Sequence, residues 1–171
     1  VFRELYRREL KALERKASDG VPMVRFDGTS DLGEGLRLAR SEEFSSPSSS
    51  IQFVDYSKSF KRAMEPHPGQ FTICFSYSGS NSQECREVLE DNKLVSIVFD
   101  RNPRKNEALP ETCSVAGKVF KVLDGNKHDA LCYHDPGAIV GLSFKAAKDR
   151  KGALAASGSF VVRGKGKHLS C

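Results

Sequence analysis

The stretch from residue 128 to residue 145 constrains the fold of this chain more than any other. Two apolar runs, Ala130–Tyr133 and Ala138–Phe144, flank the tetrapeptide His134-Asp135-Pro136-Gly137. Proline presets a turn dihedral and glycine tolerates a positive φ, so the tetrapeptide is typical of a turn. The flanking runs are rich in aliphatic and aromatic side chains, which suit a pleated, buried surface. We therefore predict a central β-hairpin that is buried in a hydrophobic core.

Regular hydrophobic patterns predict the other main elements. Val1–Ala17 carries apolar residues at helical spacing, which indicates an amphipathic helix. In Gln70–Tyr77, large apolar residues alternate strictly with smaller residues, which indicates a strand. Further strands are predicted over Val21–Phe26, Leu94–Phe99, Val115–Leu123 and Ser159–Arg163. Short strands with one or two helices favour an α+β fold, in which an antiparallel β-sheet packs against an α-helix.

Two loop-like segments divide the chain. Residues 45–50 (SSPSSS) are low in complexity, and residues 65–69 (EPHPG) break any regular element. We predict an N-terminal helix and extension over residues 1–69 and an α+β core over residues 70–171, with one domain overall as the alternative. No apolar run reaches the roughly 20 residues that a membrane span requires, so we expect no span.

Positive charge is concentrated late in the chain. The formal net charge is +5, yet residues 145–167 alone carry seven basic residues and one acidic residue. Such a cluster attracts phosphate groups, whether in RNA, DNA or anionic lipid. The alternative is a lysine-rich loop that only interacts with solvent.

The chain contains five cysteines: Cys74, Cys85, Cys113, Cys132 and Cys171. An odd number leaves at least one thiol unpaired, and the sequence alone does not select a pairing. No CxxC occurs and no histidine has zinc-ligand spacing to a cysteine, so we expect no metal site. A first residue that is valine rather than methionine fits a processed, secreted chain as well as a trimmed one.

The order of elements in residues 70–171 resembles that of the small fungal guanyl-specific ribonucleases and ribotoxins. The likeness rests on the strand, glycine turn and helix of residues 71–91, on the segment DALCYHDPGAIVG (residues 129–141), on Leu109-Pro110 and on the terminal cysteine. The resemblance implies a ribonuclease-like α+β fold and a disulfide between Cys74 and Cys171. It leaves Cys113 and Cys132 as candidates for a second pair. Residues 1–69 have no counterpart in the family.

The family cleaves RNA with a carboxylate base, a histidine acid and an arginine that holds the phosphate, which is ordinary acid–base chemistry with charge stabilisation. The place of the glutamate falls near Glu107, with Glu111 as the other candidate. The place of the arginine falls on Ala130, and that of the histidine falls on Lys145. Because the acid and the phosphate clamp are absent from these places, the chain resembles the catalytically degenerate ribonuclease-like effectors that fungal plant pathogens secrete.

The leading hypothesis is therefore a secreted virulence effector, acting inside host cells as well, that binds RNA or a host protein such as an immune receptor without catalysis. We expect a monomer without a cofactor. Tyr77 or Tyr133 would stack on bases. The predicted phosphate-binding residues are Arg101, Arg104, Lys105, Lys145, Lys148, Arg150 and Lys151.

Two alternatives remain open. The first is an active secreted endoribonuclease with a rearranged site, which would use Glu107 or Glu111 together with His128, His134 or His168. The second is an unrelated β-rich protein-interaction domain, in which the basic loop only aids solubility.

Overall fold

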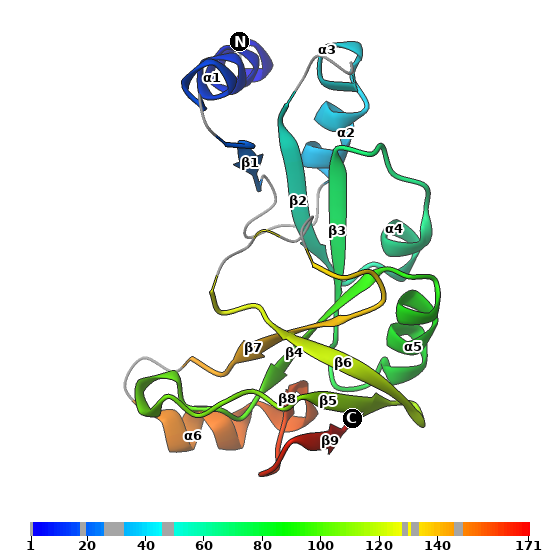
Figure 1. The fold of residues 1–171 in the computed structure, drawn as a ribbon, viewed down its shortest axis with the longest axis vertical. Helices are drawn as coiled ribbons and strands as arrows, with labels where there is room; N and C mark the ends of the chain where they lie inside the picture. The colour runs from blue at the N-terminus through cyan, green and yellow to red at the C-terminus, as the bar shows by residue number, and fades with distance from the viewer. Residues whose placement is uncertain are drawn as a thin grey trace. The chain divides into compact units, whose positions relative to one another are not determined.

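A computed structural model describes residues 2–17, 20–25, 33–45, 50–127, 130, 134–145 and 149–171 of the chain. The chain divides into two compact units (Figure 1). The first unit comprises Val1–Asp55 and Pro66–Thr72, and the second comprises Tyr56–Glu65 and Ile73–Cys171. The predicted boundary after residue 69 falls close to the end of the first unit, but Tyr56–Glu65 belongs to the second. Within the described residues, no helix has the length and apolar character needed to cross a bilayer.

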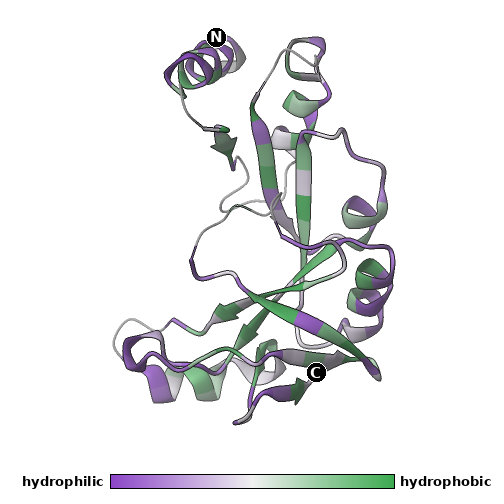
Figure 2. Cartoon of the chain, in the orientation of Figure 1, coloured by the Kyte–Doolittle hydropathy of each residue, from purple (hydrophilic) through white to green (hydrophobic). Residues whose placement is uncertain are grey.

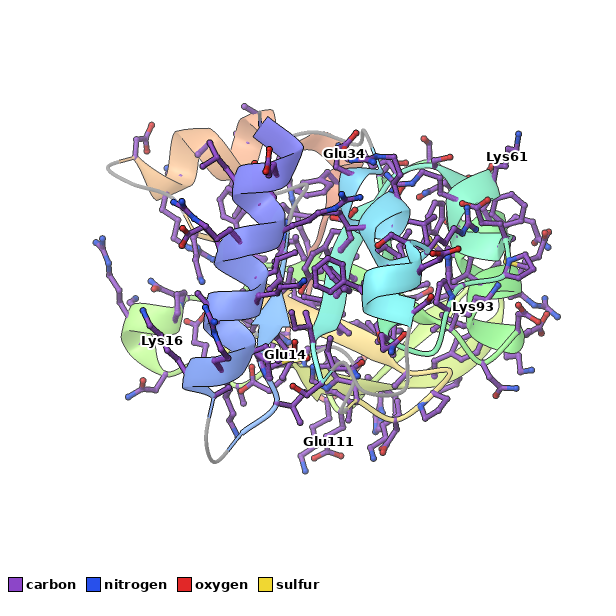
Figure 3. All side chains as sticks on the ribbon, turned by 90° about the horizontal axis from the view of Figure 1, so that it is seen from above. Glu14, Lys16, Glu34, Lys61, Lys93 and Glu111 are labelled. Carbon is purple, nitrogen blue, oxygen red and sulfur yellow. The ribbon has the colours of Figure 1, made fainter. Side chains whose placement is uncertain are left out.

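The first unit is mainly helical. The predicted N-terminal helix is confirmed as α1 (Phe2–Lys16), and the short predicted strand as β1 (Met23–Val24). The unit also contains α2 (Glu34–Ala39), α3 (Glu42–Ser45) and the start of β2 (Gln52–Ser57), which pairs in parallel with β1. Glu14 lies on α1 (Figure 3). It accepts a hydrogen bond of 2.6 Å from the backbone N–H of Ser50, so this helix is tied to the segment that precedes β2.

The second unit contains most of the sheet. Its strands hydrogen-bond in the order β3-β4-β7-β6-β5-β9, and β8 pairs with β4. The strands are β3 (Phe71–Ser76), β4 (Leu94–Phe99), β5 (Thr112–Val115), β6 (Lys118–Asp124), β7 (Ile139–Ser143), β8 (Val161–Val162) and β9 (His168–Ser170). The helices are α4 (Phe60–Met64), α5 (Ser82–Glu90) and α6 (Arg150–Ala156), with 3₁₀ turns η1 (Pro103–Lys105) and η3 (Gly158–Phe160). The mixture of helices and strands agrees with the expected α+β composition.

The expectation of an antiparallel sheet is wrong. Within the described part of the second unit, the strand pairs are parallel except for β5 and β6, which form an antiparallel hairpin. This hairpin replaces the single strand predicted over Val115–Leu123, because the chain turns at Ala116 and Gly117, both with positive φ. Parallel strands need long crossover connections, and here α5 provides the one between β3 and β4.

The predicted hairpin around residues 134–137 is also wrong. The second apolar run does form a strand, β7, but this strand pairs in parallel with β4 on one edge and with β6 on the other. Both edges of β7 are therefore occupied, and no edge is left for an antiparallel partner. Residues 131–133 lie outside the described residues, and Ala130 is not part of a strand. A strand that is covered on both faces needs a continuous apolar run, which explains its composition.

The predicted turn at residues 136–137 is confirmed, although it leads into β7 rather than joining two strands of a hairpin. Gly137 has a φ of 69°, and a Cβ atom there would lie 3.1 Å from the carbonyl oxygen of Leu89 at the end of α5. A glycine is required on both counts, because other residues avoid this backbone region and would crowd the helix.

The core of the second unit lies between the sheet and α5. Fully buried side chains include Phe75, Val88, Ile97, Phe99 and Ile139. Hydrophobic residues follow β4 and β7 almost without interruption, whereas β9 is mainly hydrophilic (Figure 2). Complete burial of each such side chain contributes roughly 1.5–3 kcal/mol. This core fixes β4, the strand that orients the candidate site.

Three parallel strands end at the same edge of the sheet. Phe99, the last residue of β4, is level with Ser143 of β7 and with Val162 of β8. The arrowheads of β4 and β7 point toward the side where α6 lies (Figure 1). Residues that follow these strands therefore gather there. In open α/β sheets, ligands bind outside the carboxyl ends of the strands.

Candidate functional site

A cavity of about 880 Å³ lies at this edge and is lined by three segments that are far apart in the sequence. The segments are residues 100–109 after β4, residues 150–154 of α6 and residues 164–167 before β9. Its charged lining residues are six basic ones and two acidic ones: Arg101, Lys105, Arg150, Lys151, Lys165 and Lys167, and Asp100 and Glu107. The cavity thus carries a net positive charge, and its volume is in the range of small-ligand sites.

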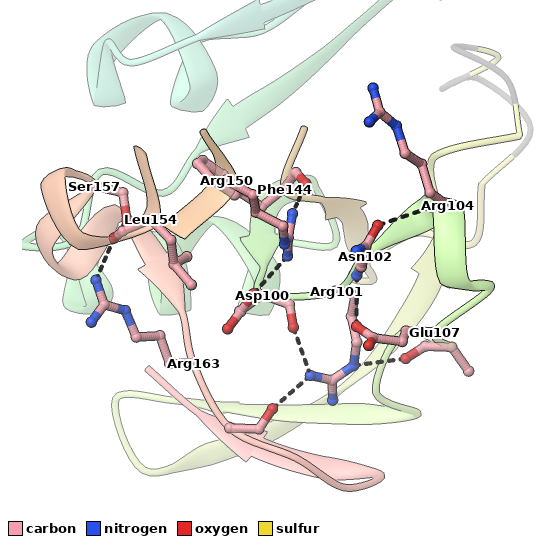
Figure 4. Close-up of polar contacts among 12 residues, drawn as sticks. Asp100, Arg101, Asn102, Arg104, Glu107, Phe144, Arg150, Leu154, Ser157 and Arg163 are labelled. Carbon is pink, nitrogen blue, oxygen red and sulfur yellow. Dashed lines mark hydrogen bonds and ion pairs between the residues drawn. The ribbon is translucent and has the colours of Figure 1, made fainter. Parts of the chain in front are cut away.

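Arg101 forms one wall of the cavity. Its side chain is buried, with 6% of the residue exposed. Its guanidinium donates to the carbonyl oxygens of Ala108 at 2.7 Å, Asp100 at 3.1 Å, Gly164 at 2.6 Å and Gly166 at 3.0 Å, several of which are drawn in Figure 4. Burying a charge is tolerated when it is hydrogen-bonded in this way. Arg101 therefore holds the loop after β4 to the turn before β9.

Arg150 anchors the start of α6 to the end of β4. It donates to the Asp100 carboxylate at 2.6 Å and to the carbonyl oxygen of Phe144, and its guanidinium lies 5.3 Å from the centroid of the Phe144 ring (Figure 4). Asp149 caps the helix by accepting from the backbone N–H of Gly152 at 2.9 Å. The ion pair with Arg150 neutralises the Asp100 carboxylate, which therefore adds little repulsion toward an anion in the cavity.

The other acidic group of the cavity is engaged as well. Glu107 accepts a 2.7 Å hydrogen bond from the backbone N–H of Asn102. By contrast, the side chains of Lys105, Lys151 and Lys165 are exposed, and no ion pair is recorded for them among the described residues. These three ammonium groups are the positive charges that an incoming anion meets first.

Lys167 and Glu111 form an ion pair of 2.6 Å at the rim. The hydrogen bond from Lys167 lowers the pKa of Glu111, and the same bond raises the pKa of Lys167. Glu111 projects outward from the unit (Figure 3), so the pair is fully exposed and solvent screens it. His168 follows on β9, with its Nδ1 2.8 Å from the Thr112 hydroxyl.

The structure brings together four of the predicted phosphate-binding residues, Arg101, Lys105, Arg150 and Lys151. Arg101 and Arg150 are occupied by protein partners, whereas the two lysines are accessible. Arg104 and Lys145 are exposed but do not line the cavity, and Lys148 lies outside the described residues. The sequence prediction did not include Lys165 and Lys167, although both belong to the basic segment and line the cavity. The alternation of lysine and glycine after the predicted strand Ser159–Arg163 was a signal that could have identified them.

The candidate acid–base residues are distributed over different places. Glu107 lines the cavity and Glu111 lies at its rim, but His134 precedes β7 and so lies at the opposite end of that strand from the cavity. A pair of Glu107 and His134 is therefore not formed. His128 lies outside the described residues.

The predicted disulfide between Cys74 and Cys171 is not the pairing that the structure favours. Cys85, Cys113 and Cys171 are free thiols, and the sulfur beside Cys171 is that of Cys113, at 3.8 Å. Side chains alternate along β3, so Cys74 faces away from the core side occupied by Phe75 and Tyr77. Cys132 lies outside the described residues.

The predicted stacking role of Tyr77 is not supported by its burial. Tyr77 is 5% exposed and packs in the core, where burial raises the pKa of its hydroxyl. A buried ring cannot offer its face to a base. Tyr133, the other candidate, lies outside the described residues.

Comparison with known proteins finds one family. A family model described as gene product 88 matches residues 1–160, which is most of the chain. No curated protein and no solved structure matches. The match spans both compact units, including residues 1–69, which have no counterpart in the ribonuclease resemblance.

Proposed function

We propose that this chain, which belongs to the gene product 88 family, binds single-stranded RNA through its phosphate groups, in the basic cavity at the carboxyl ends of β4, β7 and β8. The observation that carries the proposal is the convergence of six basic side chains from three distant segments on one cavity, in which both acidic groups are engaged. Binding without cleavage is the activity that we propose.

The chemistry of the cavity suits a nucleic-acid strand. Exposed ammonium groups on Lys105, Lys151 and Lys165 attract phosphates, and counterion release from the strand then favours binding. Leu109 and Leu154 supply apolar wall against which a sugar or base can pack. A hollow of about 880 Å³ accepts one or a few nucleotides but not a duplex, whose recognition takes place over a much longer surface.

Binding rather than cleavage is favoured by the residues around the cavity. No histidine lines it within the described ranges, and the carboxylate of Glu107 is engaged by a backbone N–H. General acid–base cleavage needs two groups on opposite sides of the phosphate. The mainly parallel sheet also differs from the antiparallel sheet that the ribonuclease resemblance implied, so the proposal rests on the cavity and not on that resemblance.

The test is a fluorescence-anisotropy titration of a labelled oligoribonucleotide over a series of salt concentrations. Each lysine that contacts a phosphate of a single strand contributes about 0.7 to the slope of log K against log salt. We expect the double variant Lys151→Ala/Lys165→Ala to bind more weakly and with a smaller slope. Lys61→Ala, which removes an exposed lysine of α4 outside the cavity, is the matched control and should bind like wild type. Binding that is absent at low salt, or equal in all three proteins, would refute the proposal.

A second candidate is an endoribonuclease with a rearranged site, and one observation favours it. Glu111, Lys167 and His168 lie together at the rim, and the charge of His168 contributes to the lowered pKa of Glu111. A carboxylate, an ammonium and an imidazole are the groups that RNA cleavage requires. Incubation of concentrated protein with total RNA decides this, because cleavage that is lost in both Glu111→Gln and His168→Gln would replace the binding proposal.

The wider role of a secreted fungal effector, with RNA or a host protein as its target, stays a prediction that comes from the resemblance alone. The same holds for the protein-interaction alternative. A chain that binds no RNA but is retained by a defined host protein would favour those roles over the one proposed here.

A further inference from the structure

Two thiols lie side by side on neighbouring strands. β5 and β9 pair in parallel, with Ser114 level with Ser170, and the backbone N–H of Cys171 donates to the carbonyl oxygen of Ser114 at 2.9 Å. This arrangement places the sulfur of Cys113 3.8 Å from that of Cys171. The two sulfurs are in contact but not bonded, since a disulfide bond is about 2.05 Å long.

The two thiols differ in access to solvent. Cys113 is completely buried, whereas Cys171 is half-buried and is the more exposed of the two. The hydrogen bond from the Cys113 thiol lowers the pKa of Cys171, which favours the nucleophilic thiolate form at this sulfur. Cys85, the other cysteine of the same core, is completely buried and burial raises the pKa of its thiol to about 12. The geometry thus distinguishes an accessible nucleophile from a buried neighbour.

We propose that Cys113 and Cys171 form a dithiol site that low-molecular-weight disulfides, such as glutathione disulfide, oxidise to an intrachain disulfide. In the first step the Cys171 thiolate attacks one sulfur of the reagent, which forms a mixed disulfide and releases one glutathione thiolate. In the second step the Cys113 sulfur attacks the Cys171 sulfur and displaces the second glutathione thiolate, which takes up the proton of the Cys113 thiol. The protein loses two protons and two electrons, and one glutathione disulfide is reduced to two glutathione molecules.

The disulfide between Cys113 and Cys171 would fix the position of β9, the strand that directly follows one wall of the cavity. β9 has three residues, and its recorded pairing among the described strands is with β5 alone. Residues 164–167, which line the cavity, lead directly into β9. A covalent bond between Cys113 and Cys171 would hold β9 on β5 even when the hydrogen bonds between these strands open.

The test uses the full chain, first reduced and then equilibrated with glutathione disulfide. Remaining thiols are alkylated with iodoacetamide in denaturant, and the digest is mapped by mass spectrometry. We expect a cross-link between the peptides that contain Cys113 and Cys171, together with the loss of two alkylatable thiols. Cys171→Ser should leave Cys113 alkylatable, and Cys113→Ser should accumulate a glutathione adduct on Cys171. Cys85→Ser is the matched control and should oxidise like wild type.

Two results would overturn the proposal. One is a glutathione adduct that persists on Cys171 in the wild-type protein while Cys113 remains alkylatable. The other is a cross-link that joins Cys171 to Cys74 or to Cys132 instead. Since the wild-type peptide map alone separates these results from the expected one, the test does not depend on whether the serine variants fold.

Discussion

Replacement of Arg101 by methionine should destabilise the second unit strongly. Arg101 is 6% exposed and its guanidinium donates to four backbone carbonyl oxygens, on Asp100, Ala108, Gly164 and Gly166. Methionine keeps most of the apolar stem but supplies no donor. The loop after β4 and the turn before β9 would then lose the side chain that joins them.

The expected loss follows from the number and the surroundings of these hydrogen bonds. A hydrogen bond to a charged group contributes about 1.5–3 kcal/mol. The four contributions do not add, because Ala108, Gly164 and Gly166 are exposed residues and water can replace the lost donor at their carbonyls. We therefore expect a loss of about 2–4 kcal/mol in the free energy of unfolding, the equivalent of one or two full bonds. This is a large fraction of the roughly 5–15 kcal/mol that stabilises a typical domain.

Urea denaturation followed by circular dichroism measures this change. Arg104→Met is the matched control, because Arg104 is exposed on η1, and it should stay within about 0.5 kcal/mol of wild type. If Arg101→Met also unfolds within about 0.5 kcal/mol of wild type, with an unchanged dependence on urea, Arg101 does not hold the cavity wall.

Three further predictions follow from the described contacts. Phe99→Ala removes a fully buried ring at the end of β4 and should cost about 3–5 kcal/mol of unfolding free energy in the same urea assay; a loss below about 1 kcal/mol would contradict the assigned core. Gly137→Ala places a Cβ 3.1 Å from the carbonyl oxygen of Leu89 at a φ of 69° and should cost about 1–2 kcal/mol, whereas Gly20→Ala, which has no atom within 4 Å, should cost less. The Lys167 hydrogen bond lowers the pKa of Glu111 from its ordinary value of 4.5. The stabilisation from this ion pair is therefore present above that value and is lost as the pH falls through the lowered pKa. NMR titration should show that the pKa of Glu111 rises in Lys167→Met, and an unchanged pKa would exclude the ion pair in solution.

Local patterns in the sequence predicted some elements correctly. Helical spacing in Val1–Ala17 gave α1, and the apolar run Leu94–Phe99 gave β4 with the same bounds. These patterns depend on residues that are neighbours in the chain, so they can be recognised without knowing the fold. The turn at residues 136–137 was recognised for the same reason.

The pairing of strands was not predictable in this way. An apolar run such as Ala138–Phe144 fits either a hairpin strand or a parallel strand buried on both faces, and the difference lies in which distant strands occupy its edges. The choice of an antiparallel hairpin relied on the adjacent turn, and this was the error. The neighbour of Cys171 was not predictable either, because it depends on β9 lying beside β5, which brings the sulfur of Cys113 next to that of Cys171.

The candidate site was predicted in composition but not in arrangement. The excess of basic residues was visible, and four of the predicted phosphate-binding residues do line one cavity. The burial of Arg101 was not visible, because its partners are backbone carbonyls up to 65 residues away in the chain. The contribution of Lys165 and Lys167 likewise depends on the return of the chain beside the loop after β4.

Photo-crosslinking of bound RNA to the protein tests the central claim most directly. An oligoribonucleotide that contains 4-thiouridine is irradiated with the full chain, and the adducts are mapped by mass spectrometry. We predict that the adducts lie on residues 100–109, 150–154 and 164–167, the three segments that line the cavity. Adducts that fall on α1 or on other surfaces and avoid all three segments would contradict the assignment of this cavity as an RNA-binding site.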